Sequence, residues 1–421
     1  MEGAGEPLVG GNLSSVVRMG DTVHRSVGRW TEAVHGLLRH LEDVGFEGAP
    51  RVLGLDPEGR EVLTYLEGVV PNDSPWPAFV WSEQTLTDVG HWLCRYHGAV
   101  QAYRPPEASR WWYRDGAPRR GELICHNDFA PYNTIFVGER VAGIIDWDIA
   151  GPARPAWDLA FCAWSWVPLH HPDLTRSLGG PGEDAQATRL RALCAAYGAG
   201  DPSALLPTVI ERVSASRDGI EAGVIAGDEA MRALASAGHL EDMERTLEYL
   251  HERTPTLWRE LGEEVWERQA ARIMILDERE RILLVSARDP DDDVVVWFMP
   301  GGSLEPGETL EEAARRELAE EVDGTATFEL VGPIWTRRHL HTFARHRIDL
   351  RESYFVARVD DGSIVGARET GAGAEYFEGW RWWSVDQLRS FEGIVAPSRL
   401  ATLLPDVIAG SLPGEPIDTG I

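Results

Sequence analysis

The segment that most constrains the fold of this chain runs from Gly302 to Gly324 and reads GSLEPGETLEEAARRELAEEVDG. Thr309 is followed three residues later by Glu312, which is the spacing of a capping box at the start of a helix. The sequence therefore predicts a helix from Leu310 to about Val322, with a glycine-containing loop before it.

Three glutamates of this helix are expected to share one face. Successive residues turn a helix by about 100°, so Glu317, Glu320 and Glu321 project within one narrow sector. The same sector holds an apolar stripe expected to face the domain core: Leu310, Ala313 and Ala314. Carboxylates on an inward face repel one another and lose hydration unless a divalent cation, Mg²⁺ or Mn²⁺, supplies the counter-charge. The alternative interpretation is a solvated acidic face.

The spacing of Gly302, Glu308 and the run from Arg316 to Glu321 resembles the signature of the Nudix hydrolases. This resemblance implies an α/β/α sandwich with a mixed sheet, and Mg²⁺-dependent hydrolysis of the pyrophosphate bond in a nucleoside diphosphate derivative. The metal ligands that it implies are Gly302, Glu317, Glu320 and Glu321. The chain departs from the family pattern at Asp323-Gly324, where the glycine is displaced by one position.

The resemblance also implies roles within this segment. Glu317 or Glu320 is expected to assist the attack of water on phosphorus. Arg316 is expected to orient the glutamates together with Glu308, although pairing between Glu312 and Arg316, one helical turn apart, explains the same arginine without a function.

Length and charge set the broad class. A chain of 421 residues predicts two or three domains, and no apolar run approaches the length of a membrane span. A net charge of −28 argues against nucleic acid as a partner. No signal peptide is recognised, and four cysteines without CxxC spacing favour reduced thiols over disulfides, so we expect a cytoplasmic protein. The sequence does not predict an oligomeric state.

The first half of the chain carries a second polar motif, His126-Asn127-Asp128-Phe129-Ala130-Pro131-Tyr132-Asn133. Two apolar strands, 134–137 and 141–145, follow it around a Gly-Glu turn and predict a hairpin. Folding the hairpin places Asn133 opposite Asp146, so the amide and the carboxylate predict a cation pocket for a triphosphate. Asp128 would then accept a hydroxyl proton from a phosphoryl acceptor.

This pattern, HxDxxxxN followed by Ile145-Asp146-Trp147-Asp148, resembles the aminoglycoside phosphotransferases, relatives of protein kinases. The resemblance implies a kinase-like α+β domain with a small β-rich N-lobe and a helical C-lobe, and ATP or GTP as phosphoryl donor. It makes Asp128 the catalytic base and Asn133 and Asp146 the metal ligands. His126 and Asp158 are implied as supporting residues.

One residue of that family is missing, because the chain contains no lysine. The family holds the nucleotide phosphates with a lysine on the third strand, and Arg25 is the nearest candidate by position. Arginine is a planar fork rather than a compact ammonium, so the exchange is not neutral. Glu32 is the best available helix partner for Arg25.

Two further groups have open interpretations. Trp164, Trp166 and His170-His171 either shape an acceptor pocket or pack in the core. The only basic cluster either faces a diphosphate or forms surface salt bridges: Arg337, Arg338, His339, His341, Arg345, His346 and Arg347.

The sequence therefore predicts a kinase-like domain at 1–262 and a Nudix domain at 263–421. The first hypothesis is a bifunctional enzyme that hydrolyses a nucleoside diphosphate derivative and phosphorylates the hydroxyl of a small molecule. A second is a Nudix hydrolase whose kinase-like half binds a ligand without catalysis. A third is a small-molecule (antibiotic) phosphotransferase with an accessory Nudix domain.

Overall fold

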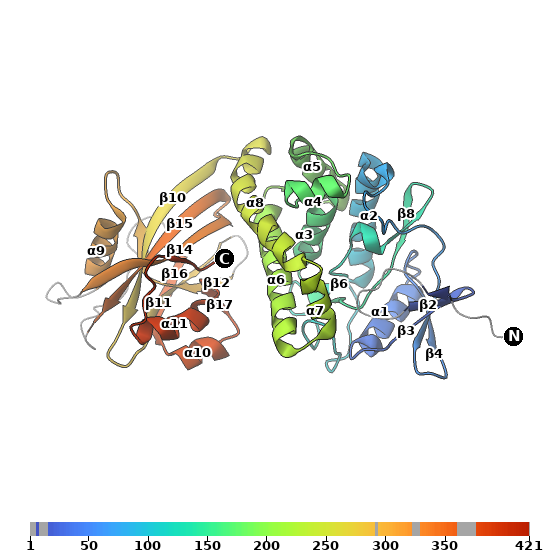
Figure 1. Ribbon diagram of the computed structural model, residues 1–421, viewed down its shortest axis with the longest axis horizontal. Helices are drawn as coiled ribbons and strands as arrows, with labels where there is room; N and C mark the ends of the chain where they lie inside the picture. The colour runs from blue at the N-terminus through green and yellow to red at the C-terminus, as the bar shows by residue number, and fades with distance from the viewer. Residues whose placement is uncertain (1–5, 8–15, 291–293, 322–328, 360–375, 421) are drawn as a thin grey trace. The chain divides into compact units, whose positions relative to one another are not determined.

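The computed structural model describes residues 6–7, 16–290, 294–321, 329–359 and 376–420. The chain divides into two compact units, residues 1–261 and 262–421, which are shown in Figure 1. No helix in the described part of the chain combines the length and apolar character that crossing a membrane requires.

The N-terminal unit begins with a small antiparallel sheet of five strands in the order β1-β2-β3-β5-β4. These strands are β1 (Glu6–Pro7), β2 (Val16–Met19), β3 (Thr22–Arg25), β4 (Val52–Leu55) and β5 (Glu61–Thr64). Helix α1 (Thr31–Asp43) lies between β3 and β4 in the chain, and it buries three leucines at helical spacing: Leu37, Leu38 and Leu41.

Helices dominate the rest of this unit. They are α2 (Glu83–Val100), α3 (Pro155–Trp166), α4 (Pro172–Ser177), α5 (Gln186–Tyr197), α6 (Leu205–Ala226), α7 (Glu229–Ser236) and α8 (His239–Glu260). Two short strand pairs stand among them: β6 (Leu123–Cys125) with β9 (Gly151–Ala153), and β7 (Thr134–Val137) with β8 (Arg140–Ile144). A small β-rich part followed by a helical part is the α+β arrangement that the sequence predicts.

The C-terminal unit is built on one mixed sheet of nine strands. Its main order is β17-β12-β11-β10-β15-β14-β18, with β13 paired to β10 and β16 paired to β11. The strands are β10 (Val265–Leu276), β11 (Ile282–Arg288), β12 (Val295–Phe298), β13 (Gly301–Ser303), β14 (Leu330–Phe343), β15 (His346–Arg358), β16 (Phe377–Trp383), β17 (Ile394–Ala396) and β18 (Ile417–Asp418). Parallel pairing occurs between β10 and β15, β12 and β17, and β14 and β18.

Helices cover both faces of this sheet (Figure 1). Helix α9 (Leu310–Glu321) packs Ala313, Ala314 and Leu318 on one face, against the odd-numbered residues of β10 such as Ile273. Helices α10 (Val385–Ser390) and α11 (Leu400–Ile408) pack on the other face, with Met274. This arrangement confirms the predicted α/β/α sandwich with a mixed sheet.

Strand β10 begins in a part of the sequence without alternating apolar residues. Val265 onward belongs to β10, which pairs with β15 over its full length from Val265↔Arg347. The three residues 267–269 are polar and exposed, although their backbone is in the sheet. Hydrophobic alternation cannot reveal a strand whose side chains face water on both sides.

Candidate active sites

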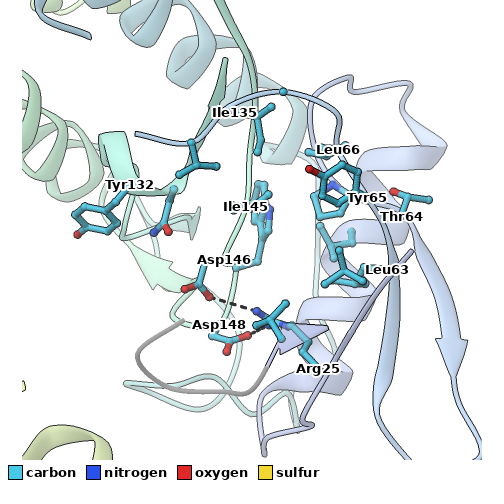
Figure 2. A pocket seen from close by; sticks show the side chains of 18 of the residues that line it. Arg25, Leu63, Thr64, Tyr65, Leu66, Tyr132, Ile135, Ile145, Asp146 and Asp148 are labelled. Carbon is cyan, nitrogen blue, oxygen red and sulfur yellow. Dashed lines mark hydrogen bonds and ion pairs between the residues drawn. The ribbon is translucent and has the colours of Figure 1, made fainter. Parts of the chain in front are cut away.

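A cavity of about 280 Å³ in the N-terminal unit is lined by three of the predicted phosphotransferase residues, Arg25, Asn133 and Asp146. Figure 2 shows Arg25, Asp146 and Asp148 at one end of it and Tyr132 at another. Apolar side chains of the small sheet and of the β7–β8 region line the remainder, among them Val23, Leu63, Leu66, Ile135 and Ile145.

The β7–β8 hairpin positions two of these residues. Thr134 pairs with Ile144, and the backbone N–H of Ile145 donates to the carbonyl of Asn133 at 2.9 Å. Asn133 therefore stands across from Ile145, one residue from Asp146, close to the position that folding the sequence predicts. Asp146 has a φ of 61° and a side chain that is about one third exposed, so its carboxylate reaches the cavity from a left-handed backbone position.

Asp128 lies beside them. Its two carboxylate oxygens accept hydrogen bonds of 2.8 Å from the Tyr132 hydroxyl and from the side-chain amide of Asn133. Burial and the nearby charge of Asp146 raise the pKa of Asp128 to about 7, although the bonds from Tyr132 and Asn133 act in the opposite direction. A carboxylate with this pKa can accept a proton near neutral pH.

His126 is buried, and burial lowers its pKa to about 4, so the ring is neutral at pH 7. The backbone N–H of Asp128 donates to Nδ1 at 3.2 Å, so Nδ1 is the acceptor and Nε2 carries the proton. Nε2 then donates to the carbonyl of Ile145 at 3.2 Å. The ring thus bridges the Asp128 segment to the residue before Asp146, which is a supporting arrangement.

Helix α3 supports the same segment from behind. The fully buried carboxylate of Asp158 accepts hydrogen bonds of 2.9 Å from the backbone N–H groups of His126 and Asn127. Eight residues later, the indole N–H of Trp166 donates to the carbonyl of Phe129 at 2.8 Å. Asn127 has a φ of 67°, so these contacts hold a backbone position that an L-residue seldom adopts.

Trp164 and Trp166 are both buried. The Trp164 indole donates to Nδ1 of His170 at 2.8 Å. The structure therefore favours core packing for this group of aromatic residues.

Arg25 reaches the cavity from β3. Its Nε lies 2.5 Å from a carboxylate oxygen of Glu61 on β5, its Nη1 lies 3.4 Å from Asp146, and its Nη2 contacts Asp148. The expected pairing of Arg25 with Glu32 is wrong. Glu32 is exposed, and Glu61 on the neighbouring strand β5 pairs with the guanidinium group of Arg25 instead.

Helix α1 still takes part in this network through a different residue. Nε2 of His35 on α1 lies 2.8 Å from the second carboxylate oxygen of Glu61. His35 is 7% exposed and Glu61 is 1% exposed, so the pair is buried. The pKa of Glu61 is lowered, because the contacts with His35 and Arg25 outweigh the effect of burial.

In the C-terminal unit the predicted capping box is present. The N–H of Thr309 donates to Glu312 at 2.8 Å, and the N–H of Glu312 donates to the Thr309 hydroxyl at 3.3 Å. Arg316 instead contacts Glu308, with Nε and Nη2 at 3.0 and 3.1 Å from its two carboxylate oxygens. The contact of Arg316 with Glu308 is thus present, and the alternative pairing with Glu312 is not.

Glu317 occupies the centre of this region. Nη1 of Arg316 donates to Oε1 of Glu317 at 2.6 Å and lies 3.5 Å from Oε1 of Glu320. A β-carbon added to Gly302 would lie 2.2 Å from the same oxygen of Glu317, so only glycine leaves room for the carboxylate. Burial and the charge of Glu320 raise the pKa of Glu317, against the opposing effect of Arg316.

The remaining glutamates differ from the expected inward face. The side chain of Glu320 is 41% exposed, and Leu318 takes the buried position beside the alanines. The side chain of Glu321, Val322 and Asp323-Gly324 lie outside the described part of the chain. For a divalent cation, the fit therefore rests on Glu317 and Glu320, two carboxylates that both lie close to Arg316. Their roles as ligands stay predictions.

A buried charged cluster beside this helix was missed from the sequence. Nε of Arg272 lies 2.7 Å from Glu352, and its Nη1 donates to the carbonyl of Gly301 at 3.0 Å. Glu352 also accepts from Arg337 at 3.1 Å and from the Tyr354 hydroxyl at 2.8 Å. The charge of Arg272 lowers the pKa of Glu317, so this cluster adjoins the predicted metal face.

The basic cluster of the sequence forms salt bridges. Arg337 pairs with Glu352 as above, and Arg338 pairs with Asp349 at 2.8 Å. Nε of Arg347 lies 3.8 Å from Glu263. His346 stacks on Trp266. For these residues the structure favours salt bridging and packing over contact with a diphosphate.

Comparison with known proteins gives two family matches. The model of the NUDIX domain matches residues 266–402, within the C-terminal unit. The model of the phosphotransferase enzyme family matches residues 112–206, within the N-terminal unit. The first region contains α9 and the second contains the Asp128 segment.

Individual relatives agree with these matches. The trifolitoxin immunity protein of Rhizobium leguminosarum bv. trifolii is 35% identical over 195 residues, 45% of this chain and 73% of that protein. Because the C-terminal unit has only 160 of the 421 residues, or 38%, this match includes residues of the N-terminal unit. A putative 8-oxo-dGTP diphosphatase of Bacillus subtilis is 32% identical over 123 residues, 29% of this chain and 70% of that protein.

Among solved structures, a choline/ethanolamine kinase family protein from Mesorhizobium loti is similar to the chain with 20% identity and a TM-score of 0.38. The match covers 62% of this chain and 90% of that one.

Proposed function

The chain belongs to the Nudix family through its C-terminal unit and to the phosphotransferase enzyme family through its N-terminal unit, and we propose that it is a bifunctional enzyme. The proposed activities are hydrolysis of the pyrophosphate bond of a nucleoside diphosphate derivative, and transfer of a phosphoryl group from ATP or GTP to the hydroxyl of a small molecule. We assign the second activity to residues 1–262 and the first to residues 263–421.

The observation that carries the hydrolase is the environment of Glu317. Its carboxylate lies against Gly302, is bonded to Arg316, and has a pKa raised by burial and by Glu320. A carboxylate that holds a proton more readily than usual is a better base toward water. Arg316, itself fixed by Glu308, keeps this carboxylate from rotating away.

We propose that a divalent cation is held by Gly302, Glu317, Glu320 and Glu321 in the C-terminal unit, and by Asn133 and Asp146 in the N-terminal one. Bound there, Mg²⁺ or Mn²⁺ would supply counter-charge to phosphate oxygens and lower the pKa of a water molecule. Glu317 or Glu320 is the proposed acceptor of the proton of the attacking water.

For phosphotransfer, Asp128 is the proposed base. Its pKa of about 7 matches the task, since the group is a strong enough base and is still partly ionised at neutral pH. Tyr132 and Asn133 each bond one carboxylate oxygen and so fix its orientation. Arg25 is the proposed contact to the phosphates of the donor nucleotide. Its Nε is bonded to Glu61, which in turn contacts His35.

Glutamine substitutions at two positions of α9 test the proposed hydrolase activity. With a panel of nucleoside diphosphate derivatives and Mg²⁺, Glu317→Gln is expected to lower kcat by about 100-fold or more. Glu311→Gln is the matched control, because Glu311 is exposed on the same helix and pairs only with Arg315 among the described residues. Equal activity of the two variants would refute the assignment.

The double change Glu320→Gln with Glu321→Gln is expected to abolish hydrolysis and leave phosphotransfer intact. Loss of both activities would contradict two independent sites. The panel includes 8-oxo-dGTP, because one relative is named as a putative diphosphatase of that nucleotide. A 5′-triphosphorylated RNA is included as well, since the acidity of the chain predicts slower turnover of a polyanion.

A second candidate is a Nudix hydrolase whose N-terminal unit binds a nucleotide or another ligand without catalysis. It is favoured by the absence of lysine and by the contacts that Arg25 makes with Asp146 and Asp148. Phosphotransfer that disappears in Asp128→Asn, with nucleotide binding retained, would exclude this candidate. Nucleotide binding without any turnover would establish it in place of the bifunctional enzyme.

A third candidate is a phosphotransferase that modifies an antibiotic or toxin, with an accessory Nudix domain. The name of the Rhizobium relative, an immunity protein for trifolitoxin, favours this acceptor class. Assays with peptide and aminoglycoside acceptors test this candidate. Only the acceptor class that the protein modifies should incorporate phosphate, and Asp128→Asn should abolish that incorporation.

A further inference from the structure

A second cavity in the N-terminal unit has a volume of about 660 Å³ and shares no lining residue with the first. It is bordered by the end of α2, the segment before β6 and the start of α3. Its lining residues are His97, Gly98, Gln101, Arg104, Pro118, Arg119, Arg120, Gly121, Glu122, Leu123 and Pro155.

The charge of this cavity is opposite to that of the protein. Three arginines line it, Arg104, Arg119 and Arg120, against one carboxylate, Glu122, in a chain of net charge −28. Glu122 is already committed, since it contacts Arg114 and accepts from the backbone N–H of Arg119 at 2.7 Å.

Arg119 and Arg120 are exposed arginines that line this cavity. Within the ranges that the structure describes, neither makes a hydrogen bond, an ion pair or a ring contact. Arg104 donates to the carbonyls of Gln101 and Tyr103, which directly follow α2. Arg119 and Arg120 therefore give the cavity wall two guanidinium groups that no side chain of the described residues neutralises.

Helix α3 also begins at this cavity, but it adds no clear anion-binding group. Its first residue, Pro155, lines the cavity and has no N–H, and its first turn carries the carboxylate of Asp158. The positive groups of the cavity are therefore its guanidinium groups, which proteins use to bind phosphate.

We propose that this cavity is a binding site for a small molecule that carries a phosphate group. The phosphate would contact Arg119 and Arg120, with Arg104 beside it. The volume exceeds that of a phosphate ion and is in the usual range for small organic ligands, so the phosphate is expected to be part of a larger molecule.

The site also adjoins the support of the Asp128 segment. His97 lines the cavity, and its Nε2 lies 3.1 Å from the carboxylate of Asp158. Asp158 in turn receives the N–H groups of His126 and Asn127. An anion in the cavity is therefore two contacts away from the backbone that positions Asp128.

Calorimetric titration of the full chain with inorganic phosphate and with pyrophosphate, in a buffer with EDTA, tests the binding. The double variant Arg119→Gln with Arg120→Gln is expected to bind at least about tenfold more weakly, because two charge-assisted contacts are lost. The matched control is Arg39→Gln with Arg95→Gln, which removes the same charge from two exposed arginines that make no side-chain contact within the described residues and do not line the cavity.

Phosphate that binds at either proposed catalytic site should bind equally well to both double variants. Binding that both variants retain is therefore assigned to the catalytic sites and not to this cavity. Equal affinities for the two double variants, or no saturable binding by the wild type, would overturn the proposal. The result that supports it is weakened binding confined to the Arg119/Arg120 variant.

The connection through His97 has its own measurement. Phosphate is expected to slow hydrogen exchange of the amides of His126 and Asn127 in the wild type and in the Arg39/Arg95 variant, but not in the Arg119/Arg120 variant. Because this readout is an exchange rate, it does not depend on either proposed activity. Exchange that phosphate leaves unchanged in all three proteins would refute the connection.

Discussion

Replacing Glu352 with glutamine is expected to destabilise the C-terminal unit strongly. Glu352 is 5% exposed and lies between two arginines, 2.7 Å from Arg272 and 3.1 Å from Arg337, and it also accepts from Tyr354. Glutamine has nearly the same shape but no charge. The two arginines would then lose the buried carboxylate that they share.

The magnitude follows from the pKa of Glu352. Burial alone would raise this pKa, but the charges of Arg272 and Arg337 outweigh it and lower the pKa from 4.5 to about 2. At about 1.4 kcal/mol per pKa unit, this difference corresponds to about 3 kcal/mol in favour of the charged form. Removal of one partner from a buried pair costs about 3–5 kcal/mol in other proteins, so a loss of about 3 kcal/mol is expected.

Pulse-labelling hydrogen exchange across a urea series measures this loss locally, because peptides of β14 and β15 report the C-terminal unit alone. Glu311→Gln is the control, since its carboxylate is 61% exposed and its pairing with Arg315 contributes little. A carboxylate whose pKa is lower in the folded protein than in the unfolded chain stabilises the fold at a pH above its pKa in the unfolded chain. This stabilisation is lost as the pH falls toward its pKa in the folded protein. The difference between wild type and Glu352→Gln should therefore be constant from pH 7 to about pH 5, and shrink toward pH 2.

Two results would refute this reasoning. One is a loss below about 1 kcal/mol at pH 7, which would mean that the arginines find other partners or water. The other is a difference that stays the same at pH 3, which would mean that packing rather than charge is responsible.

Three further changes have expected outcomes. Arg25→Lys keeps the charge but loses the fork that contacts three carboxylates, so the KM for the donor nucleotide should rise about tenfold in a phosphotransfer assay. Tyr132→Phe removes a hydrogen bond that lowers the pKa of Asp128, so the acidic limb of the phosphotransfer pH profile should move to higher pH. Gly302→Ala places a β-carbon 2.2 Å from Oε1 of Glu317, so the carboxylate must move and the kcat of hydrolysis should fall about tenfold or more.

Each change has a control of the same chemistry outside the sites. An effect of similar size in the control would contradict the corresponding prediction. The controls are Arg29→Lys at an exposed ion pair, Tyr249→Phe at a hydrogen bond to Gln186, and Gly414→Ala at a position with open space.

The sequence predicts best where local chemistry decides the structure. The capping box at Thr309 and Glu312 forms because its partners are three residues apart, and the β7–β8 hairpin forms because two apolar strands flank a short turn. The same locality explains why Asn133 and Asp146 could be brought near each other from the sequence. Their roles, and those of the glutamates of α9, stay predictions that the experiments above address.

The sequence fails where residues meet through long-range pairing. Glu61 and Arg25 are 36 residues apart in the chain, and they are in contact because β3 and β5 are neighbours in the sheet. Arg272 and Glu352 are 80 residues apart and meet through the parallel pairing of β10 with β15. No periodicity marks such partners, and only the register of the sheet identifies them.

Helix α3 contacts both ends of the segment that carries Asp128, through Asp158 at its first turn and Trp166 at its last residue. The length between those anchors is set by the rise of the helix and does not depend on any ligand. An insertion or deletion between His126 and Phe129 would put one anchor out of reach, whereas the exposed turn at Gly138-Glu139 should accept added residues. Variation in natural or engineered versions of this protein is therefore expected to collect at that turn and to spare the anchored segment.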